Sequence, residues 1–203
     1  MRRFRTLPFL PAVALLALAA CSASAPPVRL YSLMPVEPAA RDASRTSIAI
    51  SLEAIRVPAQ VDQPQWLVRL PDDSLTVLEQ ERWASPLGDE LRQALLEELA
   101  ARYGAAEGRA TAGMSVLRVG VELRRFDSIP GQEARIEATW TVAGSASAPL
   151  LRCEALLREP AATGMPALAA AHRRAAVRLA DAIGESLVSM RGSTPACPSL
   201  ARP

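Results

Sequence analysis

The stretch Leu117-Arg118-Val119-Gly120-Val121-Glu122-Leu123-Arg124 alternates apolar side chains with polar or small ones. Residues 134–142 and 151–158 continue the alternation, and turn-forming residues separate the three stretches at 129–131 and 144–145. Such a pattern predicts strands that bury one face and expose the other, which is typical of antiparallel sheets. The exposed faces mix arginine, glutamate and threonine, so opposite charges can pair between neighbouring strands. We therefore expect the fold to be built around three consecutive antiparallel strands.

In the sequence, one helical pattern precedes these strands and another follows them. The first begins near Ser85 and Pro86, ends before Gly104, and repeats leucine every four residues at Leu87, Leu91, Leu95 and Leu99. Serine is a favoured N-cap, proline fits the first helical position, and glycine commonly ends a helix. The second pattern covers about residues 166–190 and has an apolar stripe of its own.

Shorter strand patterns precede the first helix. Residues 48–57 alternate with a shift of register near Glu53 and Ala54, which indicates a bulge. Residues 66–70 and 75–78 are predicted to form a hairpin around the turn Pro71-Asp72-Asp73. Strands grouped with two amphipathic helices predict an α+β fold. We expect an antiparallel sheet covered on one face by the two helices, as a two-layer sandwich.

The N-terminus has the pattern of an export signal. Arg2, Arg3 and Arg5 precede the uncharged residues 7–20, which end in Leu18-Ala19-Ala20 before Cys21. The uncharged run is shorter than the roughly 20 residues that span a bilayer, so it is typical of a cleaved signal. The Leu-Ala-Ala-Cys order resembles the lipobox of bacterial lipoproteins, which implies that Cys21 carries lipid. The alternative is an ordinary secretory signal that is cut elsewhere.

Composition suggests how the chain is organised. We expect a signal peptide at 1–20, a lipid-anchored tether at 21–46 with a short strand-like run at 28–33, a folded domain at 47–191 and an irregular tail at 192–203. The chain has a net charge of +2, and subtracting the three arginines of the signal leaves −1 for the rest. This balance argues against a nucleic-acid partner.

Residues for catalysis or metal binding do not converge in the sequence. His172 is the single histidine and is expected at the surface, on the polar flank of the second helix. The acid pairs Asp72-Asp73 and Glu97-Glu98 are adjacent rather than convergent, so we expect them to be solvated. No motif for a metal, a phosphate or a nucleophile occurs, so no enzyme activity, metal or cofactor is expected.

Two further cysteines, Cys153 and Cys197, lie outside the signal region. An oxidising compartment would permit a disulfide between them, which would tie the tail to a strand. Because Cys153 lies on the apolar face of its strand, a buried thiol is the alternative interpretation.

Four segments together resemble the family of ABC-type transport auxiliary lipoproteins. They are Tyr31-Ser32-Leu33-Met34-Pro35, Ile55-Arg56-Val57-Pro58, the run from Val61 to Arg69, and Glu81-Arg82-Trp83-Ala84-Ser85-Pro86-Leu87. The resemblance implies a non-enzymatic accessory role in intermembrane phospholipid transport, at the periplasmic face of the outer membrane. It also implies an MCE-domain protein and an inner-membrane transporter component as partners, and a homo-oligomeric ring. Ser22 after the lipidated cysteine, in place of aspartate, favours the outer membrane.

Two other functions remain open at the sequence level: a periplasmic assembly lipoprotein that supports an outer-membrane translocon or secretin, and a lipid-anchored hydrolase. The segments of the resemblance supply candidate partner contacts, because tryptophan and arginine are favoured at interfaces. These candidates are Pro64, Gln65, Trp66, Arg82, Trp83 and Pro86. The alternative for the two tryptophans is core packing. Aromatic residues make up only 4% of the chain, which favours a docking role over a lipid carrier.

Overall fold

The computed structural model describes residues 26–35, 37, 48–108, 115–144, 150–192 and 194–199. The expected signal peptide and Cys21 lie outside these residues. The elements of the described part are β1 (Arg29–Tyr31), β2 (Ile48–Leu52), the 3-10 turn η1 (Ala59–Val61), β3 (Gln65–Arg69), β4 (Leu75–Trp83), α2 (Leu87–Tyr103), β5 (Ala105–Glu107), β6 (Leu117–Ile129), β7 (Glu133–Ala143), β8 (Leu150–Pro160) and α3 (Met165–Ser189).

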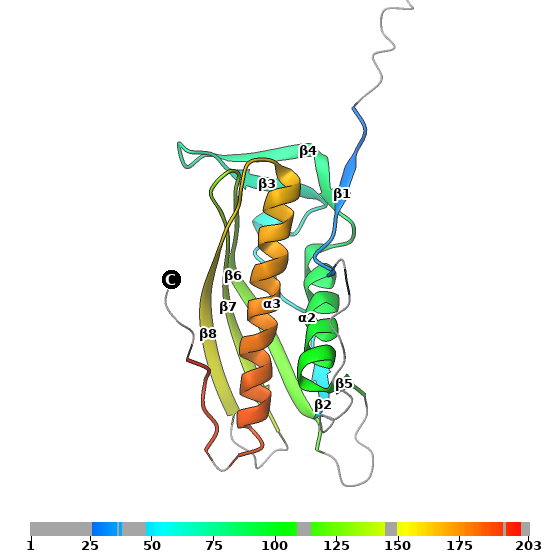
Figure 1. Ribbon diagram of the computed structural model, residues 1–203, viewed down its shortest axis with the longest axis vertical. Coiled ribbons are helices and arrows are strands. Elements are labelled where there is room, and N and C mark those ends of the chain that lie inside the picture. Colours follow the sequence, from blue (N-terminus) through cyan, green and yellow to red (C-terminus); the bar gives the residue numbers. More distant parts are fainter. Residues whose placement is uncertain are drawn as a thin grey trace, which may run out of the picture.

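The strands form two sheets, and both helices cover one face of the larger one (Figure 1). The five-stranded sheet has the order β5-β2-β6-β7-β8, and the three-stranded sheet has the order β1-β4-β3. The α+β sandwich expected from the sequence is therefore confirmed. The sheets are mixed, however, because β2 runs parallel to β5 and β6, and β1 runs parallel to β4. Helix α2 lies between β2 and β5 in the chain and provides the long crossover that a parallel pair requires.

The strands β6, β7 and β8 carry the centre of the core. They pair antiparallel in the order expected, with Val121, Trp140 and Cys153 in register on the inner face. The alternation holds throughout β7, where every inward residue is buried. Strand β6 continues to Ile129, beyond the predicted stretch, after a bulge between Leu123 and Arg125.

Strand β2 ends at Leu52, and the chain rejoins β6 at a single bridge between Arg56 and Glu122. The predicted interruption near Glu53 and Ala54 thus corresponds to a break in the pairing. The hairpin of β3 and β4 is also confirmed, with its turn closed by a hydrogen bond from Leu70 N to Ser74 O.

Helix α2 follows its leucine pattern closely, since Leu91, Leu95 and Leu99 are fully buried. Gly104 ends the helix in a left-handed conformation, with a φ of 64°. The predicted serine cap is wrong: Pro86 is the N-cap residue, and no side chain caps the helix. The hydroxyl of Ser85 donates instead to Oε1 of Glu90, at 2.9 Å, which draws it away from the helix N-terminus.

Helix α3 is buried over much more than one stripe. It contacts β7 and β8 on one side and α2 on the other, so its flanks are covered as well as its sheet-facing side. The two helices come close together at Gly184, because a Cβ atom there would lie 2.3 Å from the ring of Tyr103.

The folded unit begins before residue 47, where the sequence placed its boundary. Strand β1 lies within the expected tether, pairs with β4, and leads into Leu33, which is 2% exposed. At the other end, residues 194–199 have no regular secondary structure, as expected for the tail.

Candidate functional site

The four segments that carry the family resemblance lie together between the three-stranded sheet and the start of α2, in the upper half of Figure 1. Backbone hydrogen bonds join three of them: Ala84 N donates to Tyr31 O at 2.8 Å, and Trp83 N donates to Pro64 O at 3.1 Å. The fourth segment joins them at Ile55, because the backbone carbonyl oxygen of Ile55 lies against α2. A Cβ atom at Gly88 would be 3.0 Å from that oxygen. The residues of the resemblance thus build a single structural unit.

Glu90 holds this unit together from the first turn of α2. Its side chain is buried and accepts hydrogen bonds from the hydroxyl of Ser32 at 2.7 Å, from Leu33 N at 2.8 Å and from the hydroxyl of Ser85. A carboxylate that accepts several hydrogen bonds is compensated for its loss of water. Glu90 therefore fixes the segment after β1 to the start of α2.

An aromatic cluster fills the space below the three-stranded sheet. The rings of Trp66 and Trp83 lie 4.2 Å apart, and Tyr31 meets Trp66 edge-on at 5.0 Å. Trp83 in turn packs edge-on against Phe126 of β6. Both tryptophans are core residues, 1% and 5% exposed. Their prediction as partner contacts is therefore wrong, and the alternative of core packing is confirmed.

His172 belongs to the same cluster and is fully buried, so its expected surface position is wrong. Its ring stacks on Phe126 with 4.1 Å between the centroids. The flank of α3 on which it lies is covered by the aromatic residues of β3, β4 and β6. The alanines around this flank were the sequence signal for the burial of His172, because a helix that is apolar on several sides is buried on several sides.

Trp66, Ser128 and His172 form a chain of buried hydrogen bonds. The indole Nε1 of Trp66 donates to the hydroxyl of Ser128 at 2.7 Å, and that hydroxyl lies 2.8 Å from Nε2 of His172. Since the indole is only a donor, the serine proton is free to be donated to Nε2. The neutral histidine then carries its own proton on Nδ1, which is buried and has no hydrogen-bond partner among the described residues.

Burial alone lowers the pKa of His172 to about 3, from an ordinary 6.5. The ring is therefore neutral at any physiological pH. A serine and a histidine at this distance also occur in nucleophilic catalysis, where a third group orients the base. Here Ser128 and His172 are 2% and 0% exposed, and Nδ1 lacks an orienting carboxylate. The pair has no access to a substrate and acts in packing.

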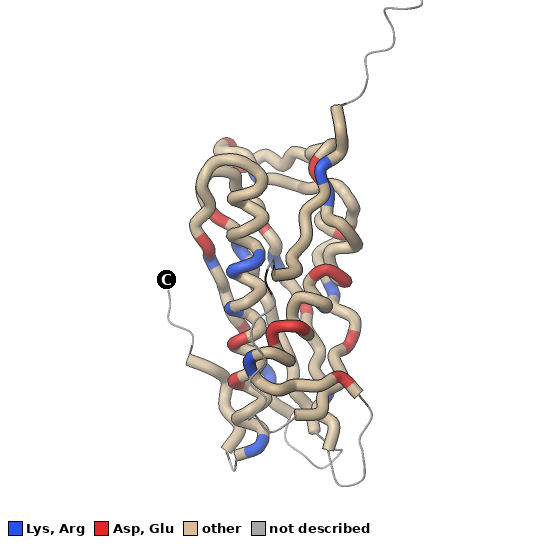
Figure 2. Tube along the Cα trace, turned by 45° about the vertical axis from the view of Figure 1, so that its right-hand side comes forward, with Lys and Arg blue, Asp and Glu red and all other residues tan. Residues whose placement is uncertain are grey.

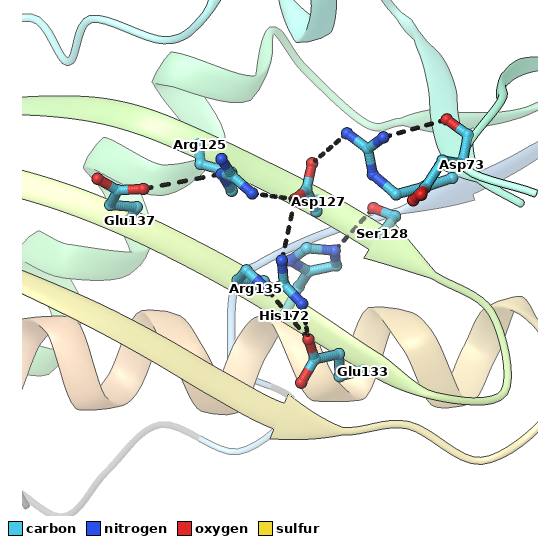
Figure 3. A network of polar contacts seen from close by, with 9 residues as sticks. Asp73, Arg125, Asp127, Ser128, Glu133, Arg135, Glu137 and His172 are labelled. Atoms are coloured by element: carbon cyan, nitrogen blue, oxygen red, sulfur yellow. Dashed lines mark hydrogen bonds and ion pairs between the residues drawn. The ribbon is translucent and has the colours of Figure 1, made fainter. Parts of the chain in front are cut away.

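A second polar cluster surrounds Asp127 on the opposite face of β6 (Figure 3). Its buried carboxylate lies 3.3 Å from Arg69 of β3, 3.5 Å from Arg125 and 3.8 Å from Arg135. Arg69 also donates to Asp73 O in the hairpin turn, at 3.2 Å. This cluster ties the hairpin to the five-stranded sheet from outside, while the aromatic cluster ties it from inside.

Four of the six predicted contact residues do reach the surface. Pro64 and Pro86 are exposed, and Gln65 and Arg82 are half-buried. Gln65 and Arg82 are partners in the register of β3 and β4. The structure thus leaves four of the predicted residues at the surface, without the two tryptophans; we call Pro64, Gln65, Arg82 and Pro86 the contact surface.

The outer face of the five-stranded sheet carries an open groove of about 630 Å³. It is lined by Glu122, Arg124, Thr139, Arg152, Cys153, Glu154 and Cys197. At its edge Cys153 of β8 and Cys197 of the tail are joined in a disulfide, which ties the tail to the strand. Cys153 is therefore part of a disulfide and is not a free buried thiol.

The predicted acid pairs behave differently from each other. Asp72 and Asp73 are exposed in the hairpin turn, as expected. Glu98 is only 5% exposed, so its prediction as a solvated residue is wrong. It pairs with Arg102 one turn later, at 3.1 Å, and that arginine also binds Asp181 of α3 at 2.7 Å. These charges join the two helices at their solvent edge.

Over the residues that the structure describes, no three histidine, cysteine or acidic side chains gather in a way that could hold a metal ion. In the same residues neither helix is long and apolar enough to cross a membrane.

The chain belongs to the family of ABC-type transport auxiliary lipoprotein components, whose model matches residues 31–184. This match confirms the family that the four segments indicated. It begins at Tyr31, the last residue of β1, and ends within α3, so it covers most of the sandwich.

Solved structures share this fold at low sequence identity. Protein XCC0632 from Xanthomonas campestris has 20% identity and a TM-score of 0.62, over 79% of this chain and 95% of that one. A crystal structure of an uncharacterised protein has 16% identity and a TM-score of 0.63, over 79% and 98% of the two chains. At these identities the similarity concerns the fold alone. A comparison with curated protein sequences returned no match.

Proposed function

We propose that the protein is an outer-membrane lipoprotein, lipidated at Cys21 and held at the periplasmic face. In this proposal it is a non-enzymatic accessory component of an MCE-type system that moves phospholipid between membranes. The observation that carries the proposal is the family match, which begins ten residues after Cys21, the residue that follows the signal-like segment. The partners are an MCE-domain protein and an inner-membrane transporter component, and the protein itself assembles as a ring.

Three features support docking rather than catalysis or lipid carriage. The Ser128–His172 pair is enclosed in the core, so it offers no nucleophile to a substrate. The outer groove is lined largely by charged side chains and the disulfide, whereas an acyl chain needs a broad apolar lining. The helices and the sheet use their apolar faces on each other.

The contact surface supports a specific docking site. Pro64, Gln65, Arg82 and Pro86 lie on segments that the buried aromatic cluster and Glu90 join to the rest of the fold. A surface on rigid elements loses little conformational freedom on binding, which favours affinity. Arg82 is its only charged member and is therefore the residue to test.

Partner capture tests the docking role. The tagged protein is purified from detergent-solubilised membranes of its native host, as wild type, Arg82→Ala and the control Arg158→Ala, an exposed arginine on the outer face of β8. We expect an MCE-domain protein to copurify with the wild type and the control, and several-fold less of it with Arg82→Ala. Circular dichroism confirms that the variants fold. Recovery of a translocon or secretin component in place of an MCE-domain protein would overturn the proposal.

Lipidation and location need a separate test. Cells that express wild type or Cys21→Ala are labelled with palmitate, and their membranes are separated on a sucrose gradient. We expect labelled wild-type protein in the outer-membrane fraction and no label on Cys21→Ala. Equal labelling of both proteins, or wild-type protein in the inner-membrane fraction, would contradict this part of the proposal.

A further inference from the structure

Several large aliphatic side chains are exposed on the outward side of the three-stranded sheet. Five of the eight exposed large hydrophobic side chains of the described residues lie on this sheet or directly beside it: Val28, Leu30, Leu70, Leu75 and Val77. Isolated exposed apolar residues are ordinary, but a cluster of them marks a surface that contacts a membrane or another protein. We call Val28, Leu30, Leu75 and Val77 the upper patch.

The strand pattern places Leu30, Leu75 and Val77 on the outward side of the sheet, with Leu30 in register with Arg82 near the end of β4 and Leu75 and Val77 at its start. Tyr31 packs inward on Trp66, so its neighbour Leu30 points outward, where it is 64% exposed. In β4, Leu75 and Val77 alternate with less exposed residues, and they pair with Arg69 and Leu67 of β3. The patch therefore spans β1 and β4 and faces away from the core.

The upper patch lies close to the proposed lipid anchor. Val28 is seven residues after Cys21 in the sequence. A chain spans at most about 3.3–3.6 Å per residue, so Val28 is within about 25 Å of the lipidated residue, whatever path the intervening chain takes. An anchored protein must consequently keep this end of the molecule near the bilayer. This step rests on the lipidation proposed above.

The charges around the patch are balanced. Arg29, Arg69 and Arg82 provide the positive charges, and Asp72, Asp73 and Glu79 provide the negative ones. In Figure 2 the tube across the upper end is largely uncharged, with charged positions at either side. Such a patch can approach a membrane surface with zwitterionic headgroups. Anionic lipids would instead repel Asp72 and Asp73 of the turn.

We propose that the upper patch rests on the surface of the bilayer that holds the lipid anchor, among zwitterionic headgroups. Anchors hold firmly when a second signal adds to the acyl chains, and an apolar surface supplies such a signal. The contact sets the orientation of the molecule: β3 and β4 lie along the membrane, and the far ends of α2 and α3 extend away from it (Figure 1).

Depth-dependent quenching tests this contact. Val77→Cys and, as a matched control, Val188→Cys are labelled with an environment-sensitive fluorophore; Val188 is also exposed and lies next to the last residue of α3, at the opposite end of the molecule. The native cysteines do not react, since Cys153 and Cys197 are paired and Cys21 is acylated. The lipoprotein is reconstituted in vesicles of phosphatidylethanolamine and phosphatidylcholine, with and without bromine on the acyl chains.

We expect brominated lipid to quench the label at position 77 and to leave the label at position 188 unchanged. The quenching should persist at high salt, because the contact is apolar. Equal quenching at both positions, or none at position 77, overturns the inference. A label at position 77 that is shielded from water but not quenched by bromine also overturns it, since a second protein copy or partner then covers the patch.

Flotation separates this inference from the proposed lipidation. Unlabelled wild type and Cys21→Ala are mixed with the same vesicles and centrifuged. If the wild type fails to float, the anchor is wrong, and the inference that depends on it is wrong too. If the wild type floats but the label at position 77 is not quenched, only the upper patch is overturned.

Discussion

The hydroxyl of Ser128 lies 2.8 Å from Nε2 of His172, at a place in the core where neither residue reaches water. The hydrogen bond fixes a neutral histidine between Phe126 and the two tryptophans of the upper end. A charged imidazolium at this site would lose its hydration without gaining a carboxylate. The stability of the domain is therefore linked to the protonation of its single histidine.

Acid should destabilise the protein through His172. The unfolded chain binds a proton at this residue as the pH falls through about 6.5, whereas the folded protein holds the pKa at about 3. Stability that is fully present at neutral pH is thus lost as the pH falls between these values. We expect the free energy of unfolding to drop by about 2 kcal/mol from pH 7 to pH 5, measured by urea denaturation.

His172→Gln is the control for this dependence, since glutamine can still accept the hydrogen bond of Ser128 but does not titrate. Because the chain has one histidine, the variant should have a nearly flat stability between pH 7 and pH 5. A wild type that is equally stable at both pH values would show that the buried ring is solvated or paired.

Ser128→Ala removes a single hydroxyl group, but it should destabilise the domain more than the loss of so small a group suggests. The substitution removes the partner of both the indole of Trp66 and Nε2 of His172, and leaves these groups buried. An unsatisfied buried polar group costs about 1–3 kcal/mol, so we expect a loss in or above this range by urea denaturation. Ser51→Ala, at an exposed serine of β2, should change stability by less than about 0.5 kcal/mol. Similar values for the two variants would contradict the buried chain.

The periodic parts of the fold could be predicted from the sequence, and the pairings between them could not. Alternation in β6, β7 and β8 and the leucines of α2 report which side of an element is buried, and the structure agrees with them. Alternation contains no information about the partner of a strand. The parallel pairing of β2 depends on the crossover by α2 and therefore appeared only in the structure.

Only part of the candidate site could be predicted, again because a local sequence pattern does not report what a side chain contacts. The segments around Pro64 and Trp83 were correctly grouped, but a local string cannot tell whether an aromatic side chain points to a partner or to the core. Both tryptophans point inward because β3 and β4 fold over the end of β6 and α3. His172 was misplaced because one apolar stripe was assumed for a helix that is covered on two sides.

The disulfide should contribute measurable stability. Cys153 and Cys197 are 44 residues apart, and closing a loop of this size restricts the unfolded chain by about 2–4 kcal/mol. It also holds the tail beside β8, which is an edge strand of the five-stranded sheet. We expect Cys197→Ser to lower the free energy of unfolding by this amount and to increase aggregation, because an uncovered edge pairs with other chains.

Reduction provides the control for the disulfide. A reducing agent should lower the wild-type stability to that of Cys197→Ser and should leave the variant unchanged. Two free thiols in the unreduced, denatured wild type would instead exclude the bridge.

The contact between α2 and α3 leaves no room for a side chain at Gly184. A Cβ atom there would lie 2.3 Å from two ring carbons of Tyr103, the last residue of α2. Replacing glycine by alanine in a helix normally gains up to about 1 kcal/mol, but overpacking costs about 1–3 kcal/mol. We expect Gly184→Ala to have a net loss of stability in urea denaturation, whereas Gly108→Ala should be nearly neutral because no atom lies within 4 Å of its added carbon.

A second substitution decides whether the ring of Tyr103 is the cause of that loss. Tyr103→Ala removes the ring, so a methyl group at position 184 then has space, and the normal helical preference for alanine applies. Residues in contact are not additive, and the double variant should be more stable than the sum of the two single losses predicts, by about 1–2 kcal/mol. Strict additivity would mean that the two helices already separate enough to accept the methyl group, and that Gly184 does not set their distance.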